Sequence, residues 1–199
     1  MLMPQFSEPA IPCLLRFNSQ IIEAALSLVA EHDAAGRPAY AGLVGTHIRH
    51  VIEHYEALVS PALPGVVDYD QRPRDRELER SGRLARARLL ALHQRMNDWE
   101  ELDLDATVSI HGQAGLGGEL CFAVASTIGR ELVSVASHAV HHFALLQGHC
   151  LEHGIPTGED FGKAPATVAH ERVRVLPDTP ISNPIQTKEP TCPKLLRAA

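Results

Sequence analysis

The sequence predicts an all-α protein, a four-helix bundle of the up-and-down type with a small β-hairpin between the third and fourth helices. Apolar residues recur at helical spacing in four long segments. The spacing changes to strict alternation in one short region, and Gly or Pro closes the helical segments. A chain of 199 residues can bury a single core, so we expect one domain.

The four helical segments are expected at about residues 18–32, 40–60, 75–99 and 126–153. Either Ser126 or Thr127 could cap the last of them, because both side chains accept a backbone N–H at a helix start. The stop signals are Gly36-Arg37-Pro38, Pro61 and Gly154-Ile155-Pro156. The bundle is therefore expected to cover residues 14–155.

The hairpin is predicted near residues 107–123, where polar and apolar residues alternate on both sides of a Gly-rich stretch at 112–118. That stretch lacks the GK[ST] of a phosphate-binding loop and does not lie in a βαβ unit, so we do not interpret it as one. Residues 156–199 show no periodicity, and we expect an irregular tail that is partly extended or disordered.

Histidine clusters on the second and fourth helical segments are the strongest functional signal. His138 and His142 are four residues apart, which places their rings one above the other on one helix face. His47, His50 and His54 share one face of the second segment, the face that should point into the bundle. One cation can bind both nitrogens of such an i, i+4 pair, and a third His from another helix would complete the site.

A single His on an apolar face is more often a hydrogen-bonded core residue than a metal ligand. Several neutral imidazoles facing one core, however, are costly to desolvate unless they share a partner, and a cation supplies that partner. We therefore favour a metal site for the two clusters together. The isolated histidines are expected to be surface or loop residues: His32, His93, His111 and His170.

Composition narrows the classes of partner. A net charge of −6 provides no basic surface for nucleic acid. We find no apolar run long enough to span a membrane and no signal peptide, and the four cysteines are widely scattered. We therefore expect a cytoplasmic protein that acts on a small molecule, without a nucleic-acid or membrane partner, and a homodimer is left open.

The two His clusters resemble those of the DinB/YfiT-like family of metalloenzymes, which are four-helix bundles with a three-histidine metal site. His50 matches the family's helix-two ligand, because it precedes the aliphatic pair Val51-Ile52. His138 and His142 match the HxxxH of the last long helix. The resemblance covers about residues 14–155. It departs from the family pattern in that His47 or His54 could replace His50.

The resemblance implies a divalent transition metal, Zn²⁺ or Ni²⁺, and chemistry related to thiol-dependent transferases, with a low-molecular-weight thiol as cosubstrate. A hydrolase is the related alternative. Glu131 lies on the same stripe as His138, so it is a candidate catalytic residue that orients a ligand ring or acts as a base. A non-catalytic protein that carries a metal or small ligand, and a bundle whose histidines are coincidental, are the other hypotheses.

Overall fold

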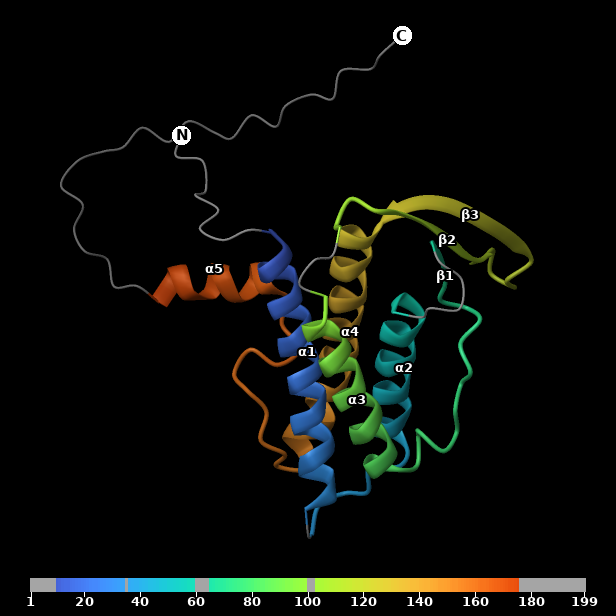
Figure 1. Ribbon diagram of the computed structural model, residues 1–199. Helices are drawn as coiled ribbons and strands as arrows, with labels where there is room; N and C mark the ends of the chain where they lie inside the picture. Colours follow the sequence, from blue (N-terminus) through green and yellow to red (C-terminus); the bar gives the residue numbers. More distant parts are fainter. Residues whose placement is uncertain (1–9, 35, 60–64, 100–102, 176–199) are drawn as a thin grey trace, which may run out of the picture. The chain divides into compact units, whose positions relative to one another are not determined.

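The computed structural model in Figure 1 describes residues 10–34, 36–59, 65–99 and 103–175. The chain is mainly helical with a small three-stranded sheet. It divides into two compact units, residues 1–164 and residues 165–199, which are described separately.

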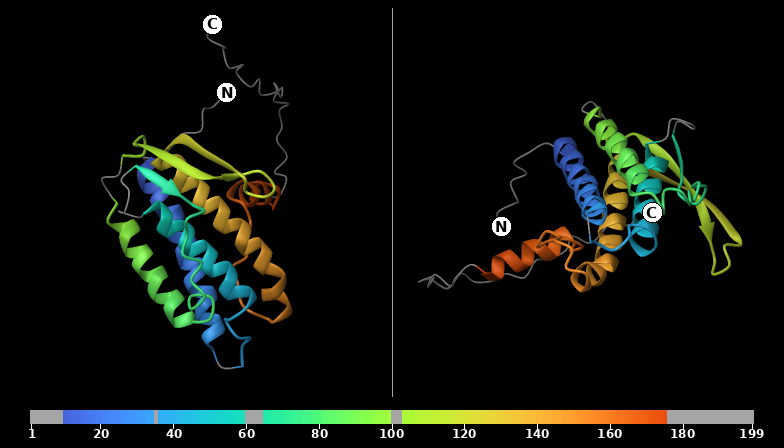
Figure 2. Two further views of the ribbon diagram at one scale, coloured as in Figure 1. Left: turned by 90° about the vertical axis from the view of Figure 1, so that its right-hand side faces the viewer. Right: turned by 90° about the horizontal axis from the view of Figure 1, so that it is seen from below.

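Four long helices of the first unit pack side by side (Figures 1 and 2). Each of them contacts two others: α1 and α2 both pack against α3 and α4. The predicted helices are all present, with bounds that differ at the ends. The helices are α1 (Ala10–Asp33), α2 (Leu43–Leu58), α3 (Gly82–Asn97) and α4 (Ile128–Glu152).

Capping side chains explain two of these bounds. Thr127 is the N-cap of α4 and accepts the N–H of Arg130 at 3.3 Å, so the second of the two predicted caps is the one used. Ser81 caps α3, which therefore begins seven residues later than the predicted residue 75. Asp75 instead closes a turn, since its carboxylate accepts the N–H of Glu77.

The helix directions differ from the predicted up-and-down order. Glu56 of α2 pairs with Arg88 of α3, and the Val59 carbonyl after α2 accepts from Arg95, so α2 and α3 run in the same direction. The reason is the connection between α2 and α3, whose residues 65–81 return along the length of the helices before α3 begins (Figure 1). Helices α2 and α4 are antiparallel, whereas α1 and α4 are parallel.

The predicted hairpin is present and longer than expected. Strands β2 (Thr107–Ala114) and β3 (Leu120–Thr127) pair in antiparallel fashion. A third strand that the sequence analysis missed, β1 (Val66–Asp68), pairs parallel with β2 in the order β1-β2-β3. The sheet lies across the end of the helices at which α4 begins (Figure 2).

The core lies between the four helices and continues under the sheet. Apolar side chains from all four helices are buried in it, among them Ile22, Ile52, Leu89 and Leu132. Val67, Val108 and Ile110 extend the core to the sheet. This burial fixes the separation of α2 and α4, the two helices that present the histidine clusters to each other.

Among the described residues, α1 is the one helix long and apolar enough to cross a membrane, by length and composition alone. The core helix of a soluble protein has the same length and composition. Seven α1 residues are buried in the first unit.

The second unit contains a helix where an irregular tail was expected. Helix α5 covers Pro165–Val175 and begins with proline, which is favoured at the first position of a helix. The expectation of extended or disordered chain from residue 177 onward lies outside the described residues.

Candidate metal centre

The antiparallel packing of α2 against α4 brings the two histidine clusters together. His50 of α2 lies opposite His138 of α4, and His47, one turn earlier, lies opposite His142. Both helices turn a mixed apolar and histidine face toward each other because Val51, Ala139 and other apolar neighbours on that side are buried. The periodicity in the sequence therefore predicted the meeting of the clusters.

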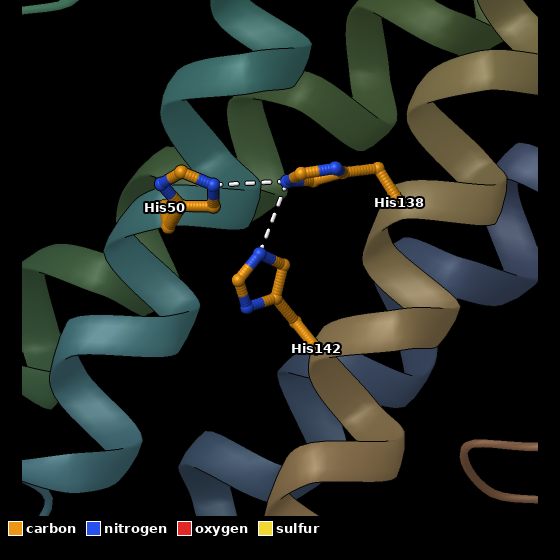
Figure 3. Close-up of side chains that lie close together, drawn as sticks. All are labelled: His50, His138 and His142. Carbon is orange, nitrogen blue, oxygen red and sulfur yellow. Dashed lines mark hydrogen bonds between the residues drawn. The ribbon is translucent and has the colours of Figure 1, made fainter. Parts of the chain in front are cut away.

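Three ring nitrogens converge at this interface (Figure 3). The Nε2 atom of His138 lies 2.9 Å from Nε2 of His50 and 3.0 Å from Nε2 of His142. One nitrogen from each ring lies within 4.8 Å of the other two. A tetrahedral ion bound at 2.0–2.1 Å needs ligand nitrogens about 3.3 Å apart, so small shifts suffice to admit one. The three histidines, each half-buried, could hold a metal ion.

The structure places His50, and not His47 or His54, in this group of three. His47 instead contacts the far side of the His142 ring, with the two Nδ1 atoms 2.7 Å apart. The His54 Nδ1–H donates to the backbone carbonyl of His50 at 2.8 Å, and its ring stacks on His138 at 4.3 Å between centroids. Both residues therefore support the rings of the central three.

The electrostatics of the cluster favour neutral imidazoles. Burial is the largest cause of their lowered pKa values and neighbouring histidine rings a smaller one; for His50 and His54 the Arg72 charge also contributes. Together they lower the pKa of His50 to about 2, His54 to about 4 and His142 to about 3. Burial also lowers the pKa of His47 and His138. A neutral imidazole is the form that binds a metal, so at neutral pH the cluster does not have to release a proton to do so.

A buried ion-pair network supports His50 from the side away from α4. The Arg72 Nη1 atom donates to Nδ1 of His50 at 2.9 Å and lies 3.7 Å from a carboxylate oxygen of Glu53. Glu53 is 1% exposed, and it also accepts from Arg49 and from the backbone N–H of Asp75. This network was not predicted from the sequence, although Glu53 lies one turn after His50 on the same helix.

The contact with Arg72 constrains the His50 ring. A guanidinium is only a donor, so Nδ1 of His50 must be the acceptor and the proton of the neutral ring is on Nε2. Binding a cation through Nε2 needs the opposite tautomer, with the proton on Nδ1. Arg72 must therefore move away from His50 when a cation binds through that atom.

Glu131, the candidate catalytic residue, lies at the start of α4 and is 1% exposed. Its two carboxylate oxygens accept from Tyr69 at 2.8 Å, Ser126 at 2.6 Å and Arg130 at 2.8 Å. Tyr69 in turn stacks on His54, with 5.5 Å between the ring centroids. Within the described residues, the hydrogen bonds of Glu131 reach the cluster through Tyr69 and not through a histidine ring.

Two cavities adjoin the cluster. One, of about 530 Å³, is lined by His138, His141, Ser137 and Arg130 on the outer face of α4. The other, of about 460 Å³, is lined by Arg72, Arg74, Asp70 and the β2–β3 hairpin. The first cavity is lined by His138 itself, and the second by Arg72, which contacts His50. Both cavities therefore present polar and charged side chains beside the converging rings.

Comparisons with known proteins do not identify a family for the chain. No protein family matches it, and no solved structure does. A curated protein, "FK506-binding protein 5" of Rhizopus delemar, is 26% identical over 119 residues. The match covers 60% of this chain but 31% of that protein, so the chain spans about a third of the length of this curated relative.

Proposed function

We propose that this chain is a divalent-metal-binding protein of the DinB/YfiT-like type, with α1–α4 as its four-helix bundle. In this proposal His50, His138 and His142 bind Zn²⁺ or Ni²⁺, and the protein is a metal-dependent thiol S-transferase or hydrolase-type enzyme for a small molecule. The observation that carries the proposal is the convergence of three Nε2 atoms from two helices.

The donor set fits a borderline transition metal. Neutral imidazole suits Zn²⁺, Ni²⁺ and similar ions, and three protein ligands leave positions open for exchange. Such an ion, when bound, favours the deprotonated form of a water or thiol beside it. No carboxylate or thiolate belongs to the group of three, so the ligands do not neutralise the charge of the ion.

The remaining residues have supporting roles in this proposal. His54 is held in one tautomer by the His50 carbonyl and packs against the His138 ring. Glu131 orients Tyr69, which packs on His54, so we assign Glu131 a positioning role instead of a role as base. Arg72, once it leaves His50, presents a cation to the cavity beside the cluster, where it would attract an anionic group of a substrate.

A non-catalytic protein that binds a metal or small ligand is the second candidate. The observation in its favour is Glu131, which is 1% exposed and whose two oxygens accept three hydrogen bonds from the protein, so the carboxylate is turned into the fold and not toward a substrate. The name of the Rhizopus delemar protein adds nothing to either candidate, because the match covers 31% of that protein.

The test is elemental analysis of untagged protein, followed by a screen of small thiols with electrophilic substrates. His138→Ala and His142→Ala should each remove one metal equivalent per chain while the helical circular dichroism signal is kept. His93→Gln, on α3, is the matched control and should keep the metal. A double variant that retains all of its metal would contradict the proposal. A metal-loaded protein that turns over no substrate in the screen would favour the second candidate.

A further inference from the structure

A second histidine cluster lies at the C-terminal ends of α1 and α4, about two helical turns beyond His142 and outside the site described above. His32 is in the last turn of α1, and His149 and His153 are at the end of α4. The ring centroids of His32 and His149 are 5.5 Å apart, and those of His149 and His153 are 4.5 Å apart. We expected His32 to be an isolated surface or loop residue, but it is 6% exposed and its ring stacks on His149 of α4.

This arrangement has the same plan as the first cluster. His149 and His153 are an i, i+4 pair on α4, as His138 and His142 are, and the third ring comes from a neighbouring helix. At the first cluster the ring centroids are 4.4–5.0 Å apart. Rings that bind one tetrahedral ion through nitrogen have centroids about 5 Å apart, and the two ring pairs in contact at the second cluster, at 5.5 and 4.5 Å, are close to this spacing.

Two of the rings carry buried nitrogen atoms without a partner. The Nε2 atoms of His32 and His149 are both buried and make no hydrogen bond. The Nδ1–H of His32 donates to the backbone carbonyl of Pro38 at 2.9 Å, which fixes the proton on Nδ1 and leaves a lone pair on Nε2. A carbonyl partner on the other ring nitrogen is the usual second contact of a metal-binding histidine.

The helix ends supply a favourable field. Helices α1 and α4 are parallel, so both C-termini lie at this end of the unit (Figure 1). Each C-terminus carries a partial negative charge, which favours a cation within the last turn. A cation is already bound beside these helix ends, because the Arg37 guanidinium donates to the backbone carbonyl of Gly154, just after α4, at 2.7 Å.

We propose that His32, His149 and His153 form a second site for a divalent transition cation, which joins the C-terminal ends of α1 and α4. Two buried, unpartnered nitrogen atoms carry this inference, and an ion would satisfy both of them. Among the described residues the nitrogens of the first cluster alone lie within 4.8 Å of one another. Binding at the second cluster therefore requires side-chain rotation, which is open to His153 because it is exposed.

The test uses a full-length, untagged His138→Gln/His142→Gln variant, in which the first cluster cannot compete for the ion. Zn²⁺ titrated into this variant should bind at about one equivalent per chain and raise its melting temperature. Adding His149→Gln should abolish the binding. Adding His153→Gln, a change at an exposed residue, should weaken it about 10- to 100-fold, as expected for the loss of one of three ligands. Adding His93→Gln should leave it unchanged.

Circular dichroism of each variant checks that it is folded, and His153→Gln keeps the test decisive if a change at the half-buried His149 disturbs the core. No Zn²⁺ bound by the double variant would overturn the proposal. Zn²⁺ binding that is unchanged by His153→Gln would overturn it too. The outcome is independent of the first site, because both of the first site's α4 ligands are absent throughout.

Discussion

At the scale of residues, the centre of the molecule depends on which ring nitrogens carry protons. His50 accepts from Arg72 through Nδ1, while His54 donates through Nδ1 to a carbonyl. Neighbouring rings on one helix therefore have opposite tautomers. The His54 arrangement leaves Nε2 with a lone pair, whereas the His50 arrangement places a proton on the atom that faces His138. Arg72 thus competes with a cation for the lone pairs of His50.

Replacing Arg72 should strengthen metal binding. Arg72→Met removes a contact that the cation has to break, worth about 1–2 kcal/mol, so the dissociation constant for Zn²⁺ should fall about 5- to 30-fold. Glu53 keeps its contacts with Arg49 and the Asp75 N–H in this variant. Isothermal titration in a chelating buffer measures the change. Arg74→Met, on the same cavity, is the control, and weaker or equal binding by Arg72→Met would contradict the argument.

The metal-free protein should lose stability as the pH falls below about 6.5. The pKa of His54 is lowered to about 4 and that of His142 to about 3 in the folded chain, while an unfolded histidine titrates near 6.5. Between these values the unfolded state binds more protons, so acid favours unfolding. The melting temperature of chelated protein should fall from pH 7 to pH 5, and less so in His138→Gln/His142→Gln. A melting temperature that is constant over this range would be evidence against neutral, buried rings.

The pairing of the two histidine clusters could be predicted from the sequence, but the side chains that contact them from outside the two helices could not. The i, i+4 spacing of His138 and His142 fixes their relation once a helix is assumed, whatever the rest of the chain does. Arg72 and Tyr69 lie in a connection without periodicity, so nothing local to them indicates that they reach His50 and His54. Such contacts are decided by tertiary packing.

At the scale of elements, residues 65–81 of the connection between α2 and α3 determine the direction of α3 and the position of Arg72. Its last part packs closely on α2, because Gly45 has no side chain: a Cβ there would lie 1.9 Å from the backbone carbonyl oxygen of Glu79. Glu79 then pairs with Arg49, which also holds Glu53. The glycine in the first turn of α2 therefore helps to position the network behind His50.

Adding a methyl group at this glycine should destabilise the protein. Gly45→Ala must displace the backbone of the connection and should reduce the free energy of unfolding by about 2 kcal/mol or more. Gly148→Ala is the matched control, since Gly148 is also helical but has nothing within 4 Å of its Cβ position. Alanine should stabilise α4 there by about 0.5–1 kcal/mol. Urea unfolding measures both values, and equal effects of the two substitutions would refute the close approach.

The presence of the four helices was easier to predict than the pairing of the strands. Thr127 and Gly154 marked the ends of α4 because capping is a local property. Strand β1 has three residues and pairs with β2 some forty residues later, so no local pattern indicates it. The parallel direction of α2 and α3 was missed for the same reason, since it depends on the path of the connection between them.

At the scale of the whole molecule, the first unit has a core that does not depend on a metal ion. Apolar side chains from four helices and the sheet are buried together, so we expect the unit to fold without metal and to gain stability from it. The histidine centre lies within this framework between α2 and α4, and the second cluster lies at the ends of α1 and α4.

Removing metal should therefore lower the melting temperature without unfolding the protein. An ion at about 100 times its dissociation constant contributes about 2.7 kcal/mol, which corresponds to about 5–10 °C in a domain of this size. Calorimetry with and without a chelator should show a single cooperative transition in both cases. Unfolding by the chelator at room temperature would contradict a core that is stable on its own.

The most direct test of the central claim is an anomalous-scattering map from crystals of untagged protein grown with Zn²⁺. The account predicts a peak about 2.0–2.1 Å from one ring nitrogen each of His50, His138 and His142, with the Arg72 guanidinium displaced from His50. A peak bound by His47 or His54 in place of His50 would show that the helix-two ligand is wrongly assigned. No peak among these rings at saturating Zn²⁺ would contradict the metal centre itself.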